Sequence, residues 1–138
     1  MSGEENMAIV RRVVDAFNKG NVGILDEVCS VDYAYHNPIG PDMDRAGITN
    51  AQAMMASAFP DRQIVVDDMF AAGDRVATRV TVRGTHRGEL WGVPPTGKEM
   101  TWTSFIIDRI MGGKIVEEWQ MTDFLGLMRQ LGLVSLPQ

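Results

Sequence analysis

The chain has 138 residues, of which 45% are hydrophobic and 22% charged, an ordinary globular composition that fits one domain over 1–138. Its formal net charge is −5, and it has no visible cluster of Lys and Arg, which argues against binding to nucleic acid. The N-terminal stretch has no basic region followed by an apolar core, and no apolar run is long enough to span a bilayer. We therefore expect a cytoplasmic protein that binds neither nucleic acid nor membrane.

Three helices are expected in the first part of the chain. Ser2 and Glu5 have the spacing of a capping box, and an apolar stripe of helical period follows at Ile9, Val10, Val13, Val14 and Phe17. Asn21 is expected to cap a second, short helix that carries Ile24, Leu25 and Val28. A third helix is predicted over 48–59, ended by Pro60. Between the second and third helices, V-D-Y-A-Y-H-N-P-I-G is an extended stretch closed by a turn.

From residue 62 onwards the pattern indicates β-strands. Strands are predicted over 62–70, 76–83, 101–110 and 114–121. The glycine pair at 112–113 supplies the positive φ that a tight hairpin turn requires. A closing helix is predicted over 123–131. Helices followed by an antiparallel meander predict the α+β class.

The chain offers few residues for covalent, metal or redox chemistry. Cys29 is the one cysteine, which excludes an internal disulfide and a cysteine-based zinc cluster, and we expect it to be a small buried residue. The two histidines, His36 and His86, are spaced for neither a catalytic triad nor a metal site. There is also no dinucleotide-binding turn. The sequence favours a pocket that uses acid and base side chains, with no metal and no cofactor.

The segment G-V-P-P-T-G-K-E at 92–99 follows a phosphate-binding P-loop pattern up to its last position. There Glu99 replaces the required Ser or Thr, and two prolines remove amide donors that would hold phosphate. The segment also leads into a predicted strand, whereas a P-loop opens a helix. We therefore interpret it as a rigid turn between strands.

Three signatures in the second half of the chain point to a family. They are G-T-H-R-G at 84–88, G-V-P-P-T-G-K at 92–98 and G-K-I-V-E-E-W-x-x-x-D-F-x-G-L-x-x-Q-L-G at 113–132. With the earlier D-Y-x-x-H-N-P and A-F-P-D, they make the chain resemble the SnoaL-like polyketide cyclases, or predicted ester cyclases, of the NTF2-like superfamily. The resemblance implies an NTF2-like cone, in which a curved antiparallel sheet wraps around the N-terminal helices and encloses a central pocket for a cyclic organic molecule.

The resemblance also implies a catalytic aspartate on the last strand, three residues before Asp123, where this chain has Gln120. A carboxamide cannot act as a general base near neutral pH, although it can hydrogen-bond a substrate carbonyl. Because side chains alternate along a strand, Val116, Glu118 and Gln120 are expected to share one face. Glu118 then becomes a substitute base with a raised pKa. The alternative, a Glu118 solvated at the edge of the strand, has equal weight.

The remaining candidates each have a structural alternative. His36 could move a proton with Asp123 or Glu118, or hold its loop through a backbone hydrogen bond. Asp123 is a further acid or base candidate that can instead cap the closing helix.

Further residues are candidates for contact with the substrate. Trp102 could wall a pocket for a flat ring or belong to the core, and it shares a face with Ser104, Ile106 and Asp108. His86 could touch the substrate or order its turn. Tyr33 and Asn37, in the D-Y-A-Y-H-N-P stretch, complete the predicted substrate-binding set.

The function that the residues and the resemblance favour is a cofactor-independent enzyme. It would move a proton at a carbon next to a carbonyl, in an aldol-type cyclisation or an isomerisation of a hydrophobic polyketide-like molecule. One alternative is an epoxide hydrolase, whose Arg–Asp pair would come from Arg79 or Arg109 with Asp108, although Arg109 and Asp108 alternate to opposite faces. The other is a ligand-binding domain that has lost its base at Gln120. A homodimer is expected in either case.

Overall fold

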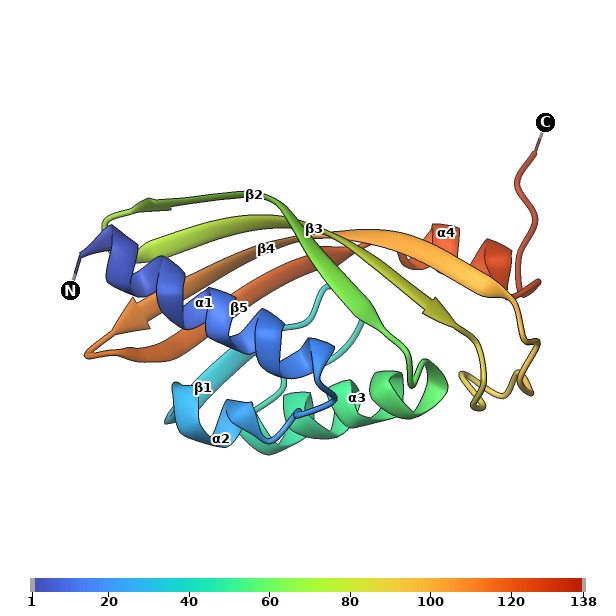
Figure 1. Ribbon diagram of the computed structural model, residues 1–138, viewed down its shortest axis with the longest axis horizontal. Helices are drawn as coiled ribbons and strands as arrows, with labels where there is room; N and C mark the ends of the chain where they lie inside the picture. Colours follow the sequence, from blue (N-terminus) through green and yellow to red (C-terminus); the bar gives the residue numbers. More distant parts are fainter. Residues whose placement is uncertain (1, 138) are drawn as a thin grey trace.

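The computed structural model describes residues 2–137, which form nine helices and strands in two layers (Figure 1). In chain order they are α1 (Gly3–Asn18), α2 (Ile24–Val28), β1 (Cys29–His36), α3 (Arg45–Ala58), β2 (Gln63–Ala72), β3 (Arg75–Thr85), β4 (Glu99–Met111), β5 (Lys114–Thr122) and α4 (Phe124–Gln130). The predicted α+β class is confirmed. Among the described residues, none of the helices combines the length and the apolar character that crossing a bilayer requires.

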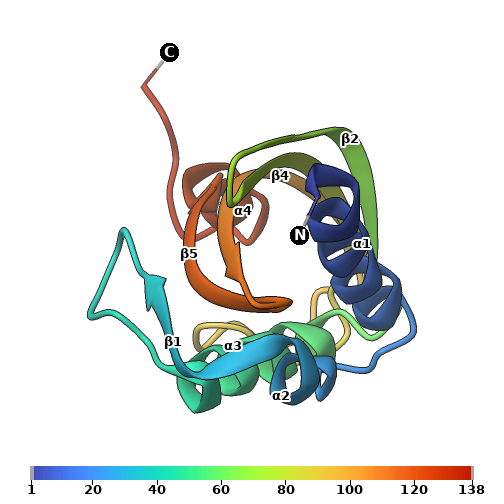
Figure 2. The same ribbon diagram turned by 90° about the vertical axis from the view of Figure 1, so that its left-hand side faces the viewer.

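The five strands form one sheet in the order β1-β5-β4-β3-β2. Strands β2 to β5 are the antiparallel meander that the sequence predicts, and β1 pairs with β5 in parallel. The sheet is therefore mixed, not wholly antiparallel as expected, because β1 joins its edge through α3 and the meander rather than through a hairpin. Seen end-on, the sheet curls and α1, α2 and α3 lie across its open side (Figure 2).

The helix starts depend on short-range capping. Ser2 accepts a hydrogen bond from the amide of Glu5, and the Glu5 carboxylate accepts one in return, which confirms the capping box. The predicted Asn21 cap is wrong, because α2 begins after Gly23 without a side-chain cap. The third helix begins at Arg45, earlier than predicted, because Asp44 caps it through the amide of Gly47.

The G-T-H-R-G signature attaches the end of β3 to the end of α3. A Cβ atom on Gly88 would lie 2.4 Å from the carbonyl oxygen of Ser57, so only glycine fits there. The amides of Arg87 and Gly88 both donate to the carbonyl of Ala58. The following segment, 92–98, is a loop that runs directly into β4, as its interpretation as a turn between strands requires.

A β-bulge changes the pattern of β5. The register between β4 and β5 shifts between Arg109 and Ile110, so the strict period of two is broken next to Val116. As a result Ile115, and not Val116 as predicted, shares the inner face with Glu118. The bulge leaves Glu118 and Gln120 on the face that the alternation predicts.

Candidate functional site

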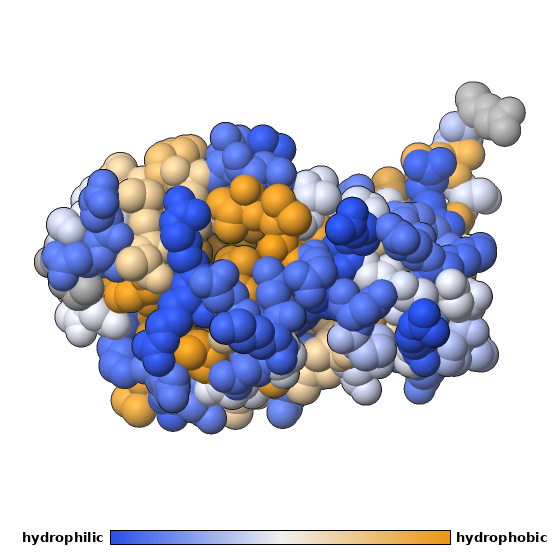
Figure 3. Space-filling view, in the orientation of Figure 1, coloured by the Kyte–Doolittle hydropathy of each residue, from blue (hydrophilic) through white to orange (hydrophobic). Residues whose placement is uncertain are grey.

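A cavity of about 260 Å³ lies between two core clusters on the concave side of the sheet. One cluster, built from α1, α2, β1, α3 and the hairpin end of the meander, contributes Val10, Leu25, Tyr35, Ile48 and Ile115 to the wall. The other cluster contributes Val80, Val82 and Trp102. Figure 3 shows hydrophobic surface gathered in a hollow between α1 and the strands, framed by hydrophilic residues. An enclosed apolar space with few polar groups is the usual form of a small-molecule site.

Aromatic side chains from two distant segments meet at this cavity. Trp91, in the loop between β3 and β4, has a positive φ of 50° and is followed by Gly92 with φ of 81°. Its ring meets Phe124 of α4 edge to face at 5.8 Å, and both residues line the cavity. Non-glycine residues rarely adopt this backbone conformation, and those that do cluster at active sites and ligand clamps. The rigid turn thus places Trp91 on the wall.

The deepest polar feature of the cavity is a pair of carboxyl groups. Asp108 on β4 and Glu118 on β5 are direct partners in the sheet register, and Asp108 Oδ1 is buried without a hydrogen-bond partner among residues 2–137. The Tyr33 hydroxyl donates to Glu118 Oε1 at 2.8 Å. Asp108 is 4% exposed, whereas Glu118 keeps some accessible surface because it borders the cavity.

Burial raises the pKa of both carboxyl groups. For Asp108, loss of solvation is the main cause, and the adjacent Glu118 charge adds to it, so its pKa lies well above the ordinary range. For Glu118, loss of solvation raises the pKa, and the hydrogen bond from Tyr33 and the adjacent Asp108 carboxyl partly oppose that rise. Two adjacent buried carboxyl groups cannot both ionise easily, because the charge on one disfavours a charge on the other. Such a pair places a base and an acid at one point of an apolar cavity.

A short row of polar side chains continues from this pair. The Gln120 amide donates to the Thr122 hydroxyl at 3.2 Å, and Thr122 is 2.9 Å from the hydroxyl of Ser104. All three line the cavity. The row can offer hydrogen bonds to a ligand oxygen beside Glu118.

The structure brings together five of the residues that the sequence singles out. Glu118, Gln120, Trp102 and Asn37 line the cavity, and Tyr33 reaches it through Glu118. Glu118 does not lie at a solvated edge, since β1 covers that side of β5. The catalytic or binding roles of these residues stay predictions.

His36 lies away from this group. Its neighbour Tyr35 points into the cavity, so His36 points to the outer face of the sheet, where its ring stacks on Trp119 at 4.9 Å. Its ring nitrogens lie 2.9 Å from Asp42 and 2.8 Å from Glu117. The predicted alternative, in which a backbone hydrogen bond holds the loop, is also not what the structure has, since both partners are carboxylates. His36 is not within reach of Glu118 for proton transfer.

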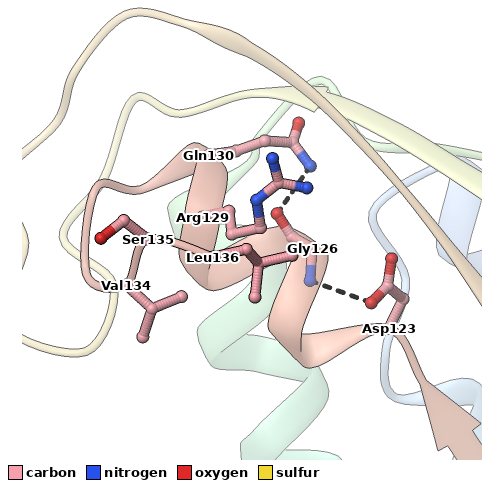
Figure 4. Close-up of a pocket in the computed structure, with 7 residues that line it drawn as sticks. All are labelled: Asp123, Gly126, Arg129, Gln130, Val134, Ser135 and Leu136. Atoms are coloured by element: carbon pink, nitrogen blue, oxygen red, sulfur yellow. Dashed lines mark hydrogen bonds between the residues drawn. The ribbon is translucent and has the colours of Figure 1, made fainter. Parts of the chain in front are cut away.

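Asp123 and His86 also lie outside the cavity wall. Asp123 accepts a hydrogen bond from the amide of Gly126 at 2.9 Å, as the predicted helix cap does, and it lines a separate open hollow between α4 and the C-terminal segment (Figure 4). His86 is fully buried, and its Nδ1 accepts from the amide of Thr96 at 3.2 Å. His86 therefore orders the loop between β3 and β4.

The Arg–Asp pair of the epoxide alternative is not formed. Arg79 pairs with Asp67 and Asp68. Arg109 pairs with Glu117 and Asp74. Both arginines lie on the outer face, opposite to Asp108, because side chains alternate along each strand.

Sequence reasoning missed two charged residues of the cavity. Asp108 shares a face with Trp102, and a carboxylate among inward-facing apolar residues is itself a signal of a functional site. Arg62 lines the opposite part of the cavity and has no comparable signal, because it precedes β2 in a polar turn. Cys29, in contrast, is buried as predicted, and burial raises the pKa of its thiol to about 12.

Comparison with known proteins identifies the family. The family model for SnoaL-like polyketide cyclases matches residues 7–131. The chain belongs to this family. Among curated relatives, the aklanonic acid methyl ester cyclase DnrD of Streptomyces peucetius is 30% identical over 90% of this chain and 88% of its own length. The nogalonic acid methyl ester cyclase of Streptomyces nogalater is 28% identical over 87% and 92%.

Solved structures of SnoaL-like proteins share the fold. AclR of Streptomyces galilaeus, for which a hydroxylase function has been proposed, superimposes with a TM-score of 0.91 at 31% identity over 97% of this chain and all of that one. IdmH of Streptomyces antibioticus, proposed to be a polyketide cyclase, gives 0.81 at 34% identity over 92% and 98%. The predicted NTF2-like cone is thereby confirmed. The family is consistent with a cyclase function, and the fold alone does not define the reaction.

Proposed function

We propose that this protein is a cofactor-independent enzyme that moves a proton at a carbon next to a carbonyl in a hydrophobic, polyketide-like molecule. The observation that carries the proposal is the Asp108–Glu118 pair, buried beside an apolar cavity with Tyr33 donating to Glu118. A carboxylate whose pKa is raised by burial is a stronger base than one in water. The methyl ester cyclases among the relatives support cyclisation as the outcome.

The chemistry needs one base and one hydrogen-bond donor. The Glu118 carboxylate would take the proton from a carbon flanked by carbonyls, while the Asp108 carboxyl and the Tyr33 hydroxyl hold it in place. The Gln120 amide would donate to the enolate oxygen that forms, in place of its present hydrogen bond to Thr122. The enolate carbon would then attack a second carbonyl, whose oxygen takes the proton back from Glu118. The product is an isomer of the substrate with one new carbon–carbon bond.

The first step can be tested without the natural substrate. We would measure the exchange of the acidic carbon-bound proton of ethyl 2-oxocyclohexanecarboxylate, a cyclic β-keto ester, for deuterium by NMR. Wild type is expected to accelerate the exchange, and Glu118→Gln to lower the rate by about 10²–10⁴-fold, the usual contribution of a general base. Glu117→Gln is the matched control, since it removes the same charge one residue away on the outer face. Exchange by Glu118→Gln at the wild-type rate would remove Glu118 as the base. An inert wild type would favour the ligand-binding alternative.

We also infer that a second copy of this chain covers the outer face of the sheet. Exposed apolar side chains there lie on neighbouring strands, with Phe105 opposite Met121 and Ile107 two residues further along β4. An apolar area of this kind on a soluble chain commonly marks an interface. The mass in solution, measured by light scattering, tests the dimer, and a monomer at all concentrations contradicts it. A cytoplasmic location stays a prediction.

A further inference from the structure

Arg62 is a buried cation in the wall of the cavity. It lies in the turn between α3 and β2 and is 7% exposed. One terminal nitrogen, Nη1, donates to the Gln52 side-chain oxygen at 2.8 Å, and the guanidinium carbon lies 5.2 Å from the centre of the Phe17 ring. Gln52 and Phe17 line the cavity as well.

The charge of Arg62 has no counter-charge among residues 2–137. None of the ion pairs found there includes Arg62, and its Nε and its other terminal nitrogen are buried without a hydrogen-bond partner. Burial lowers its pKa to about 10, so the side chain remains a cation at neutral pH. The outer-face arginines Arg79 and Arg109, in contrast, have carboxylate partners. A buried cation without one is unfavourable for folding, which points to a partner that arrives from outside the chain.

The cation and the carboxyl pair lie towards different ends of the cavity. In the sheet register Asp108 is opposite Val76 of β3, whereas Ile64, two residues after Arg62, is opposite Val82. These two positions on β3 are roughly 20 Å apart along the strand. The wall between them is apolar and includes Val80 and Trp102. A molecule that spans the cavity therefore meets a cation at one end and the base at the other.

We propose that Arg62 binds a carboxylate of the substrate, so that the enzyme takes a polyketide-like free acid with its reacting carbon towards Glu118. Binding of the carboxylate rests on the unpaired cation, whereas the orientation of the reacting carbon towards Glu118 rests on the proposed function. The side-chain oxygen of Gln52 is the one acceptor that the described residues offer to this guanidinium, and it is neutral. A carboxylate is a stronger acceptor and can take two guanidinium hydrogen bonds at once. The relatives, in contrast, bear names of enzymes for methyl esters, in which that charge is masked.

The test compares an acid with its own ester. We would titrate the protein with 2-naphthoic acid and with methyl 2-naphthoate, and measure binding by calorimetry at neutral pH. Wild type is expected to bind the acid about ten- to a hundredfold more tightly than the ester, the range of a charge-assisted hydrogen bond. Arg62→Met and Arg62→Gln are expected to lose this preference. Arg79→Gln is the matched control, since it removes a paired arginine from the outer face.

Two results would overturn the inference. One is wild type binding acid and ester equally, or binding neither, a result that needs no folded variant. The other is an Arg62→Gln protein that keeps the preference for the acid. Glu118→Gln separates this inference from the proposed function, because it is expected to lower the rate of proton exchange and still bind the acid. A wild type that shows no preference for the acid but still exchanges the proton overturns the Arg62 subsite alone. A wild type that prefers the acid but does not exchange the proton overturns the proposed function alone.

Discussion

Glu117 and Glu118 are neighbours in the chain, yet they lie in opposite chemical environments. Glu117 is on the outer face, 28% exposed, and accepts hydrogen bonds from His36 and from Arg109, each at 2.8 Å. These hydrogen bonds lower the pKa of Glu117, and the bond from His36 has the largest effect. Glu118 is on the inner face, where burial raises its pKa and its partners are the hydroxyl of Tyr33 and the carboxyl of Asp108. The comparison teaches that the alternation of the strand, not the residue type, decides which glutamate can act as a base.

The two environments also differ in how their charges are balanced. The outer glutamate is neutralised by cations, so it is a weak base with little reason to gain a proton. Asp108 and Glu118 have no cation among their described partners. A negative charge on either carboxyl group has therefore lost its solvation by water and is stabilised only by neutral groups. That imbalance keeps the inner pair ready to bind or release a proton.

The largest effect is expected from moving the inner carboxylate along its own face. Gln120 also faces the cavity, so an aspartate there could replace the lost base. Glu118→Gln combined with Gln120→Asp should therefore exchange the proton on the order of tenfold faster than Glu118→Gln alone. The control is Glu118→Gln combined with Met121→Asp, which adds the same charge next to it on the outer face, where Met121 is 64% exposed. Exchange rates for the cyclic β-keto ester measure both. Equal recovery in the two double variants would mean that the face of the strand does not matter.

A smaller effect is expected from removing one donor of the inner pair. Tyr33→Phe leaves the buried Glu118 short of a hydrogen bond and should lower the free energy of unfolding by about 1–3 kcal/mol. Tyr35→Phe is the matched control, because Tyr35 is buried on the same strand and no hydrogen bond of its hydroxyl was found among residues 2–137. Urea denaturation compares the two variants. Equal losses would show that the Tyr33 hydrogen bond contributes nothing beyond packing.

The fold could be predicted further than the site. Period-two alternation, the glycine pair at 112–113 and the capping box at Ser2 are local signals, and they gave the strands, the hairpin and α1 correctly. The bulge next to Val116 and the parallel pairing of β1 depend on contacts between distant segments, so no local pattern contained them.

For the site, alternation sufficed for Glu118, Gln120 and Trp102, since all lie on strands. It did not suffice for His36, because the sequence does not show which face of a short edge strand turns inward. Arg62 could not be predicted either. Its importance comes from a missing partner, and only the packed structure shows that no carboxylate approaches it among the described residues.

The smallest effect concerns the pH dependence of stability, in which the two faces should act in opposite directions. The folded pKa of Glu117 lies below its ordinary value of 4.5, so the stabilisation it provides is present above that pH and is lost as the pH falls through the folded pKa. The folded pKa of Asp108 lies above its ordinary value of 3.8, so folding binds a proton and stability falls as the pH rises from 3.8 towards the folded pKa.

Urea denaturation at a series of acid to neutral pH values measures both signs. Glu117→Gln should be less stable than wild type near neutral pH. This difference should disappear as the pH is lowered, because protonation of Glu117 in wild type removes the same ion pairs. Asp108→Asn should instead gain on wild type as the pH is raised, because it no longer carries a buried carboxyl that must ionise. Parallel curves for the two variants would mean that Asp108 and Glu118 ionise as freely as Glu117. In that case the raised basicity on which the proposed chemistry depends would be absent.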